Sequence, residues 1–319
     1  MLISSRLSTT RTDPRHVKVL ILGAGPAGLT AALYAGRAEL EPVVLAGTQT
    51  GGQVALTNTI ENYPGFLEGV GGSELGDLFQ KQAERFGALI EYDLANSVNL
   101  LMRPFKVMTD NSEYIADSII IATGASPNRL DIPGETELTG RGVSYCATCD
   151  GWFFKEKKVA VVGGGDSALE EGLFLTRFAK SVTIIHRRDS LRAGAILQKR
   201  AVENPKIKFL WNTSVMDIIG TDKVEALKLQ NIQSEEQSTF ETDGLFIFIG
   251  HTPSTQMFAG QLEMVNGYIK VNERMHTSIA GVYAAGEVAD SHFKQVITSA
   301  GMGAAAAIEA TRFLEQEAR

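Results

Sequence analysis

Both cysteines of the 319-residue chain, Cys146 and Cys149, lie within the stretch "SYCATCDGW", and Asp150 follows them directly. Two thiols at C-x-x-C spacing suit a reversible disulfide, because this arrangement favours a lowered thiol pKa. A carboxyl group beside a dithiol could protonate a thiolate that leaves during disulfide exchange. A surface carboxylate and a helix cap are the other interpretations of Asp150. The stretch therefore predicts redox chemistry and leaves the role of Asp150 open.

A zinc site and a pair of inert thiols are the alternatives for the C-x-x-C motif itself. Zinc takes four ligands, usually Cys or His in paired spacings, and the chain has no third cysteine. Its histidines form no H-x3-5-H pair and are His16, His186, His251, His276 and His292. Inert buried thiols behave as small hydrophobes and need no particular spacing. The sequence therefore favours a redox pair, and we expect no metal.

A nucleotide-binding turn is predicted near the start of the chain. Residues 17–22 have the length and composition of a buried strand, and "PAGLTAALYA" after them is helical. Between the two, Gly23, Gly25 and Gly28 fit G-x-G-x-x-G, whose glycines permit a tight turn, a close pyrophosphate and close helix packing. The pyrophosphate would lie at the helix N-terminus, where free N–H groups favour anions. The acid expected after the second strand, "PVVLAG" at 42–47, is missing.

The same pattern starts again at residue 158. "KVAVVGGGDSALEEGLFLTRFA" repeats strand, glycine turn and helix, with Gly163, Gly165 and then Ala168 in the third position. After the second strand of this unit, basic side chains replace the carboxylate of an NAD site: His186, Arg187, Arg188 and, one turn on, Arg192. Guanidinium groups bind a 2′-phosphate bidentately, whereas a carboxylate would repel it. The second turn therefore predicts NADP rather than NAD, with a solvated basic surface as the alternative.

The order of the elements predicts an α/β fold with two Rossmann-like dinucleotide-binding domains. The apolar strand at 281–290 has no third unit to join, so we expect it to return to the first sheet. A final helix is expected from about 300 to 315. The second domain is then inserted into the first, and the predicted divisions are an N-terminal extension 1–16, a first part 17–126, an inserted domain 127–254 and a second part 255–319.

Two nucleotide sites and a dithiol predict that two electrons pass in sequence through three groups, one at each nucleotide site and the dithiol. A nicotinamide delivers hydride, and a disulfide accepts two electrons, but hydride does not transfer usefully to sulfur directly. A flavin can accept hydride and pass the pair to a disulfide. We therefore expect FAD in the first domain and NADPH in the second.

The composition excludes several partners and locations. The net charge of -7 argues against nucleic acid, whose phosphates require a basic surface. No apolar run reaches the ~18 residues that a transmembrane helix needs, so we expect no membrane span. A single C-x-x-C suits a reducing compartment, and we expect a cytoplasmic location. Residues 1–16 are interpreted as a polar extension, with a targeting segment as the open alternative.

From residue 17 to its C-terminus, the chain resembles the low-molecular-weight thioredoxin reductases. The shared motifs are "GAGPAG", "GGQ" at 51–53, "ENYPGF" at 61–66, "ATGAS" at 122–126, "GRGVSYCATCDG" at 140–151, "GGGDSALEE" at 163–171, "HRRDSLRA" at 186–193, "GHTP" at 250–253 and "ITSAG" at 297–301. Their joint presence and order make the resemblance specific. The missing acid after "VVLAG" is also characteristic of that family.

The resemblance implies an FAD domain interrupted by an NADPH domain that carries the dithiol, in a homodimer. It implies that Cys146 and Cys149 cycle between disulfide and dithiol, that Asp150 is the proton donor, and that one domain rotates against the other. Trp152 and Phe153 match positions where the family presents aromatic rings to thioredoxin, with core packing as the alternative.

The resemblance also implies which residues bind the cofactors. For FAD they are Gly23, Gly25, Pro26, Ala27, Gly28, Gly52, Gln53, Asn62, Gly124, Gly286, Glu287, Lys294, Gln295 and Val296. For NADPH they are Gly163, Gly165, Asp166, Ser167, His186, Arg187, Arg188 and Arg192. The chain departs from the family near the flavin, because Glu287 replaces Asp and Lys294-Gln295-Val296 replaces Arg-Gln-Ala. These differences bear on flavin affinity and potential and on the redox partner.

The resulting hypothesis is a thioredoxin-disulfide reductase that passes electrons from NADPH through FAD and Cys146/Cys149 to a thioredoxin-like protein. The main alternative is a flavin-dependent dithiol oxidase that closes a disulfide in a small molecule with oxygen as acceptor. Its relatives lack a working NADPH site, so the arginines weigh against it. A redox sensor without turnover and an NADPH–ferredoxin reductase are weaker, because the chain shows no appended partner-binding domain and retains the C-x-x-C.

Overall fold

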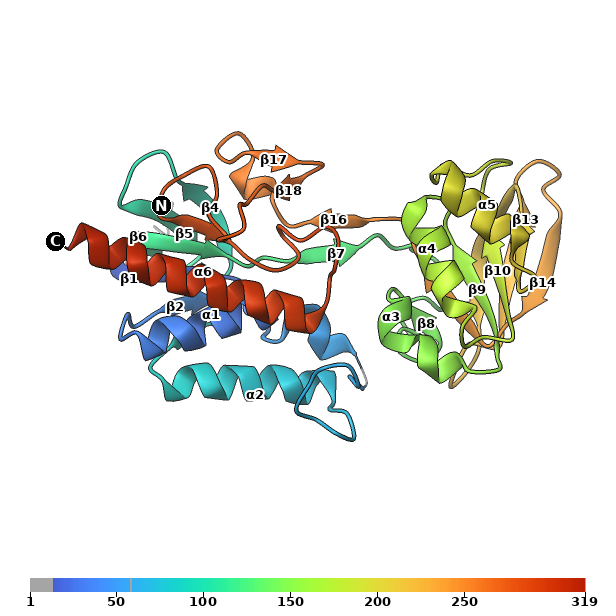
Figure 1. The fold of residues 1–319 in the computed structure, drawn as a ribbon, viewed down its shortest axis with the longest axis horizontal. Coiled ribbons are helices and arrows are strands. Elements are labelled where there is room, and N and C mark those ends of the chain that lie inside the picture. The colour runs from blue at the N-terminus through green and yellow to red at the C-terminus, as the bar shows by residue number, and fades with distance from the viewer. Residues whose placement is uncertain (1–13, 58, 319) are drawn as a thin grey trace, which may run out of the picture. The chain divides into compact units, whose positions relative to one another are not determined.

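The computed structural model describes residues 14–57 and 59–318, and this part of the chain divides into two compact units (Figure 1). The first unit runs to Ser126 and resumes at Pro253, and the second comprises Pro127–Thr252. The second unit is therefore inserted into the first. The two chain crossings pair as a two-stranded ladder, β7 (Ala125–Pro127) with β16 (His251–Pro253).

A mostly parallel sheet forms the centre of the first unit. Its path is β3-β2-β1-β6-β5-β4, and β19 pairs with β6 beside it. The strands are β1 (Arg15–Leu22), β2 (Val43–Leu45), β3 (Leu89–Glu91), β4 (Ala95–Asn99), β5 (Phe105–Thr109), β6 (Glu113–Ile121) and β19 (Val282–Ala284). The parallel pairing of Val282 with Ile119 confirms that the last strand returns to the first sheet. Apolar runs such as residues 19–22 are required because both faces of the sheet are covered.

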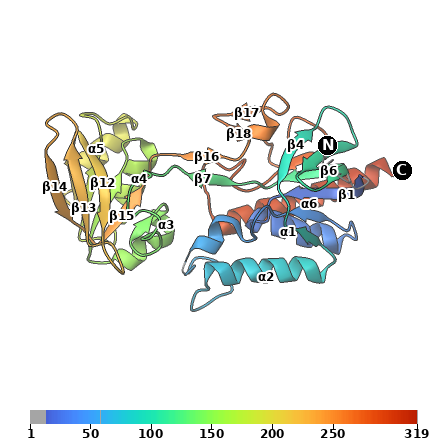
Figure 2. The same ribbon diagram turned by 180° about the vertical axis from the view of Figure 1, so that it is seen from behind.

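Three helices accompany this sheet, α1 (Pro26–Arg37), α2 (Gly72–Arg85) and α6 (Val296–Glu317). Helix α6 runs alongside α1 in both views (Figures 1 and 2). The approach is close because Gly303 has no side chain: a Cβ there would lie 2.1 Å from the carbonyl oxygen of Ala27. Of the helices in the described residues, none combines the length and apolarity that a bilayer crossing demands.

Two boundaries in the first unit differ from expectation. β1 begins at Arg15, so the last two residues of the predicted extension belong to the sheet. There the Arg15 guanidinium bonds Glu91 and Tyr114. Residues 1–13 lie outside the described part. Helix α6 begins at Val296 instead of near residue 300, because Gln295 and Thr298 form a reciprocal capping box. Gln is an uncommon N-cap, so no start signal for a helix is visible at this position in the sequence.

Short elements complete the first unit. They are the 3-10 helices η1 (Gly52–Leu56) and η3 (Gln256–Phe258) and the strands β17 (Met264–Val265) and β18 (Tyr268–Ile269). Phe258 and Ile269 belong to the apolar cluster on one face of the sheet, which also includes residues of β4 and β5, while α1 and α6 cover the other face.

The second unit contains a five-stranded parallel sheet in the order β11-β10-β9-β15-β8. These strands are β8 (Val143–Ser144), β9 (Lys158–Val162), β10 (Ser181–Ile185), β11 (Ile207–Leu210) and β15 (Gly244–Ile247). Helices pack on one face: α3 (Ala147–Asp150), η2 (Gly151–Phe154), α4 (Asp166–Leu175) and α5 (Ala195–Glu203). An antiparallel sheet covers the other face, as Figure 2 shows: β12 (Thr213–Ile219), β13 (Ala226–Asn231) and β14 (Gln237–Glu241). The sequence patterns do not predict this second sheet.

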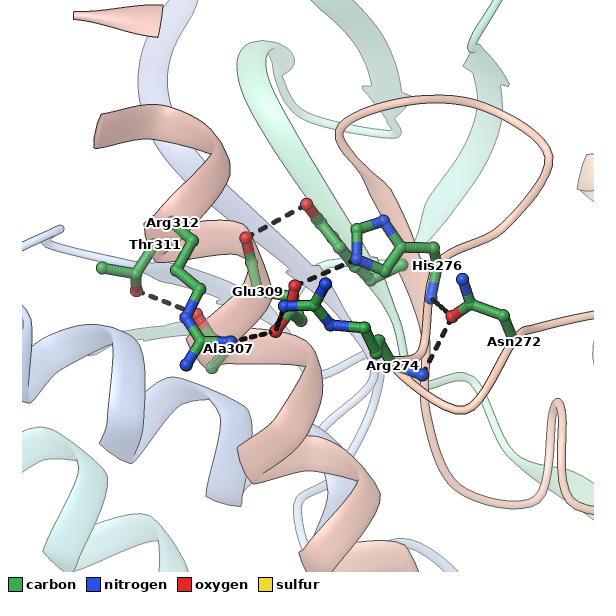
Figure 3. Close-up of polar contacts among 8 residues, drawn as sticks. Asn272, Arg274, His276, Ala307, Glu309, Thr311 and Arg312 are labelled. Atoms are coloured by element: carbon green, nitrogen blue, oxygen red, sulfur yellow. Dashed lines mark hydrogen bonds and ion pairs between the residues drawn. The ribbon is translucent and has the colours of Figure 1, made fainter. Parts of the chain in front are cut away.

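A buried carboxylate fixes α6 to the loop before β19 (Figure 3). Glu309 is 8% exposed and accepts hydrogen bonds from Arg274, His276 and Arg312. Its own burial opposes ionisation, but His276 and the two guanidinium groups together lower the pKa of the Glu309 carboxyl below its usual value. The carboxylate is therefore charged and bonded at neutral pH, which ties two segments of the first unit together.

The Glu309 contacts predict a pH-dependent loss of stability. Glu309→Gln keeps the shape but removes the charge, so it should lower the free energy of unfolding by about 1–3 kcal/mol at pH 7. Because the folded-state pKa is depressed, this contribution exists above the unfolded pKa of about 4.3 and is lost as pH falls through the folded value. Thermal unfolding at pH 7 and pH 4 measures it. Glu263→Gln, at an exposed pair with Lys270, is the control, and equal losses in both variants would contradict the assignment.

Candidate functional site

The two cysteines form a disulfide at the end of β8. Cys146 is the N-cap of the short helix α3, and its sulfur accepts a hydrogen bond from the Cys149 N–H at 3.1 Å. The bond agrees with the redox pair that the spacing predicts. Because β8 is parallel to its neighbours, the disulfide lies beyond the carboxyl edge of the second unit's sheet.

Asp150 lies partly buried at the end of α3. Ser144 donates a hydrogen bond from its hydroxyl to Oδ2 of Asp150 at 2.6 Å. Burial raises the pKa of the Asp150 carboxyl above its usual value, and the Ser144 bond opposes part of that rise. A carboxyl group with a raised pKa beside a disulfide can hold a proton and release it to a thiolate. Sequence reasoning missed Ser144, because a serine at the end of a strand carries no signal of its own.

Tyr145, the residue before Cys146, is also held in place by a buried carboxylate. The Tyr145 hydroxyl donates to Glu135 at 2.6 Å, and the same carboxylate accepts the backbone N–H groups of Leu130 and Asp131. Glu135 is 1% exposed. Burial, the hydrogen bond to Glu135 and the charge of Glu135 raise the pKa of Tyr145, so the phenol stays protonated. These contacts hold the backbone in front of the disulfide, and the sequence did not indicate them.

The predicted residues of the first glycine turn converge in the first unit. A Cβ on Gly23 would lie 2.3 Å from the Ala122 carbonyl oxygen, and Gly52 approaches the Gly25 Cα closely. Gly286 adopts φ +77° and lies against Ala27. Above Gly25 itself the space is open, and no side chain of the described residues caps α1. The turn and the uncapped helix N-terminus therefore fit the pyrophosphate of a dinucleotide.

Further candidate residues lie at the start of α6. Asn62 donates to the side chain of Gln295 at 3.3 Å, and Val296 begins the helix. Burial raises the pKa of the Glu287 carboxyl, while the nearby Lys294 opposes the rise. Lys294 adopts φ +52°, and its backbone N–H donates to Asp290.

Three more residues that were predicted to bind FAD lie in separate parts of the first unit. Gly124 adopts φ +70° just after β6, with open space where a Cβ would lie. Gln53 is the second residue of η1. Pro26 is the first residue of α1.

The second glycine turn lies between β9 and α4. A Cβ on Gly163 would lie 2.6 Å from the Ala168 Cβ, whereas the space above Gly165 is open. No side chain in the described ranges caps α4, so this turn also fits a dinucleotide pyrophosphate. Asp166 and Ser167 begin α4, and Asp166 accepts the Gly194 N–H at 2.7 Å.

The basic residues after β10 differ in exposure, because the arginines lie on the surface and the histidine is buried. Arg187, Arg188 and Arg192 are exposed, as a 2′-phosphate would require. His186 is 6% exposed, and its ring lies beneath Gly164. Burial lowers the pKa of His186, and the three arginines lower it further against a hydrogen bond with Ser190. A neutral, buried ring is suited to supporting the turn rather than to binding phosphate by charge.

Two aromatic rings follow α3 on the surface. Trp152 is 56% exposed and Phe153 is 42% exposed. The Trp152 ring meets Phe178 edge to face at 5.9 Å. The alternative of core packing is therefore wrong for both residues.

Comparisons with known proteins agree with these features. The model of the family described as pyridine nucleotide-disulphide oxidoreductase matches residues 17–303. The chain is 48% identical over 308 residues to a thioredoxin reductase of Streptomyces coelicolor, covering 95% of each protein. It is 49% identical over 305 residues to one of Rickettsia felis, covering 94% of this chain and 98% of that protein. A thioredoxin reductase structure from Streptococcus pyogenes superposes with a TM-score of 0.91 at 40% identity, covering 95% of this chain and 100% of that one.

Two alanine substitutions in the second turn should have opposite consequences. A Cβ on Gly164 would lie 2.3 Å from the His186 ring, so Gly164→Ala should destabilise the protein by about 1–3 kcal/mol. Gly165 has ordinary backbone angles and open space. Gly165→Ala should therefore keep the thermal midpoint but weaken NADP+ binding by about tenfold, or about 1.4 kcal/mol.

Thermal unfolding and titration calorimetry with NADP+ measure the two effects. Unchanged NADP+ affinity in a folded Gly165→Ala protein would show that the nucleotide does not approach this turn.

Proposed function

The chain belongs to the pyridine nucleotide-disulphide oxidoreductase family, and we propose that it is a thioredoxin reductase. It passes two electrons from NADPH through FAD to the Cys146–Cys149 disulfide, and from the resulting dithiol to the disulfide of a thioredoxin-like protein. The observation that carries this proposal is the disulfide on α3, in the same unit as the uncapped turn at Gly165.

We assign FAD to the first unit, which runs to Ser126 and resumes at Pro253. When bound, FAD accepts a hydride from NADPH and supplies two electrons to a disulfide. The backbone from Gly23 to Gly28 and the N-terminus of α1 would bind its pyrophosphate, with Gly52 and Gly286 leaving room for close approach. Glu287, Lys294, Gln295 and Asn62 are the polar side chains proposed to orient it.

We assign NADPH to the inserted unit, Pro127–Thr252. The N-terminus of α4 would hold the pyrophosphate, and Arg187, Arg188 and Arg192 would bind the 2′-phosphate. His186 supports Gly164 from below and so keeps the turn in shape.

One side chain of the protein can pass a proton to sulfur. Reduction of the disulfide to a dithiol consumes two electrons and two protons, which NADPH and one proton from solvent supply together. Asp150 is the proposed donor, because burial favours its protonated form. The hydrogen bond from the Cys149 N–H to the Cys146 sulfur would stabilise negative charge on that sulfur.

We also propose a homodimer in the cytoplasm. The resemblance supports a dimer, and so do exposed apolar side chains on α1, α2 and α6 of the first unit, such as Tyr34, Leu78 and Ile308. The partner protein would meet Trp152 and Phe153, whose exposed rings follow the dithiol directly.

The arginines predict coenzyme preference. Replacing Arg187 and Arg188 together with Gln should raise KM for NADPH about 10- to 100-fold, because a charged hydrogen bond contributes about 1.5–3 kcal/mol. KM for NADH should stay nearly constant, since NADH has no 2′-phosphate. Arg200→Gln, at an exposed position on α5, is the control. An equal rise for NADPH and NADH would refute this assignment.

The proposed activity predicts NADPH-dependent reduction of thioredoxin. Flavin absorbance should bleach rapidly when NADPH is added without oxygen, and oxidised thioredoxin should restore it. Cys149→Ser should abolish thioredoxin reduction and leave the bleaching intact. No turnover with any thioredoxin of the same organism would exclude the function, and a flavin that NADPH fails to bleach would favour the dithiol oxidase.

A further inference from the structure

Ser144, the last residue of β8, makes more contacts at the redox site than any role proposed above requires. Its hydroxyl donates to Asp150 Oδ2 at 2.6 Å and accepts the Cys146 N–H at 3.1 Å. The same oxygen lies 3.2 Å from the Cys146 carbonyl oxygen. Ser144 is 5% exposed. One buried hydroxyl therefore joins the acid of the site to the backbone of its first cysteine.

These contacts match both protonation states of Asp150. A hydroxyl has one proton and two lone pairs, so it can donate to only one of its two acceptors at a time. When Asp150 is ionised, the Ser144 hydroxyl donates its proton to the carboxylate. The carboxylate is a stronger acceptor than the Cys146 carbonyl oxygen, and it lies at the shorter distance. When Asp150 is protonated, its O–H can donate to Ser144, and the serine proton can turn to the Cys146 carbonyl. Neither state leaves a buried polar group without a partner.

We propose that Ser144 is a positioning residue for the proton chemistry of the Cys146–Cys149 pair. The Ser144 hydroxyl holds the Asp150 carboxyl in place at the end of α3. When the protonation of Asp150 changes, the hydroxyl proton rotates to its other acceptor, and no heavy atom moves. This inference rests on the proposed function. When the S–S bond takes up the two electrons that NADPH supplies, it breaks, and both sulfurs become thiolates. The Asp150 proton passes to one sulfur, the other takes a proton from solvent, and the carboxylate that remains accepts the Ser144 O–H.

The surroundings of Asp150 make Ser144 its main polar influence. Helix α4 packs against α3 and carries Asp166, Glu170 and Glu171, while η2 and β8 carry no charged side chain. Burial raises the pKa of Asp150, and the Ser144 bond is the contact that lowers it. Removing the hydroxyl should therefore raise that pKa further and keep Asp150 protonated to higher pH.

The test measures the titration of Asp150 directly in the oxidised holoenzyme. The infrared band of the protonated carboxyl is identified by its loss in Asp150→Asn and is followed against pH. Ser144→Ala should move the midpoint upward by about one pH unit. Ser144→Thr keeps the hydroxyl and should restore a midpoint near that of the wild type. Ser118→Ala is the matched control, because Ser118 is also a buried serine with a hydrogen bond, in the first unit.

Each outcome decides the proposal. An unshifted midpoint in Ser144→Ala, or an equal shift in Ser118→Ala, would overturn it. If Ser144→Ala does not fold, Ser144→Val and Ser144→Thr replace it as a pair of nearly equal shape, and only the valine variant should shift the midpoint. Equal midpoints in that pair would also overturn the proposal. The measurement needs no thioredoxin and no turnover, so it fails or succeeds independently of the proposed activity.

Discussion

Helices α1 and α4 both follow a glycine N-cap, Gly25 and Gly165, and no side chain of the described residues caps either helix. The arrangement of each nucleotide turn follows from that constraint. A helix N-terminus leaves four N–H groups without partners inside the helix, and something must bind them. In both units a strand leads into a glycine turn that keeps this end open to an anion. A bound phosphate would offset the cost of the missing caps. Each unit is therefore a complete fold that presents an incomplete helix end.

Parallel pairing places the rest of the chemistry beside those helix ends. In the second unit, β8 and β9 both pair with β15 in the parallel sense, so their carboxyl ends lie at one edge of the sheet. The disulfide follows β8, and the turn at Gly163 follows β9. The cysteines therefore lie at the same sheet edge as the second nucleotide turn because of strand direction, with Tyr145–Glu135 and Ser144–Asp150 as local anchors.

The first unit depends on its last segment. Gly286 and Gly303 both lie against Ala27, so the turn at Gly25 is supported by residues about 260 to 280 positions later in the chain. The Glu309 contacts hold this segment to the loop before β19 (Figure 3). An inserted unit is compatible with that arrangement because the crossings at β7 and β16 pair with each other, which keeps the two ends of the insertion together.

Short patterns of residues were enough to predict the features that depend on interactions within a few residues. Glycine spacing in a strand-turn-helix pattern, the C-x-x-C pair and the apolar run at 281–290 each act within a few residues, and they were sufficient to predict both nucleotide turns, the redox pair and the return of the last strand. Other features become visible only in the folded chain. They are the partners of Asp150 and Tyr145, the burial of His186 beneath Gly164, the start of α6 at Val296 and the antiparallel sheet β12–β14. Burial and hydrogen bonding between distant segments, such as Asn62 with Gln295, depend on how the whole chain packs, and no local pattern encodes them.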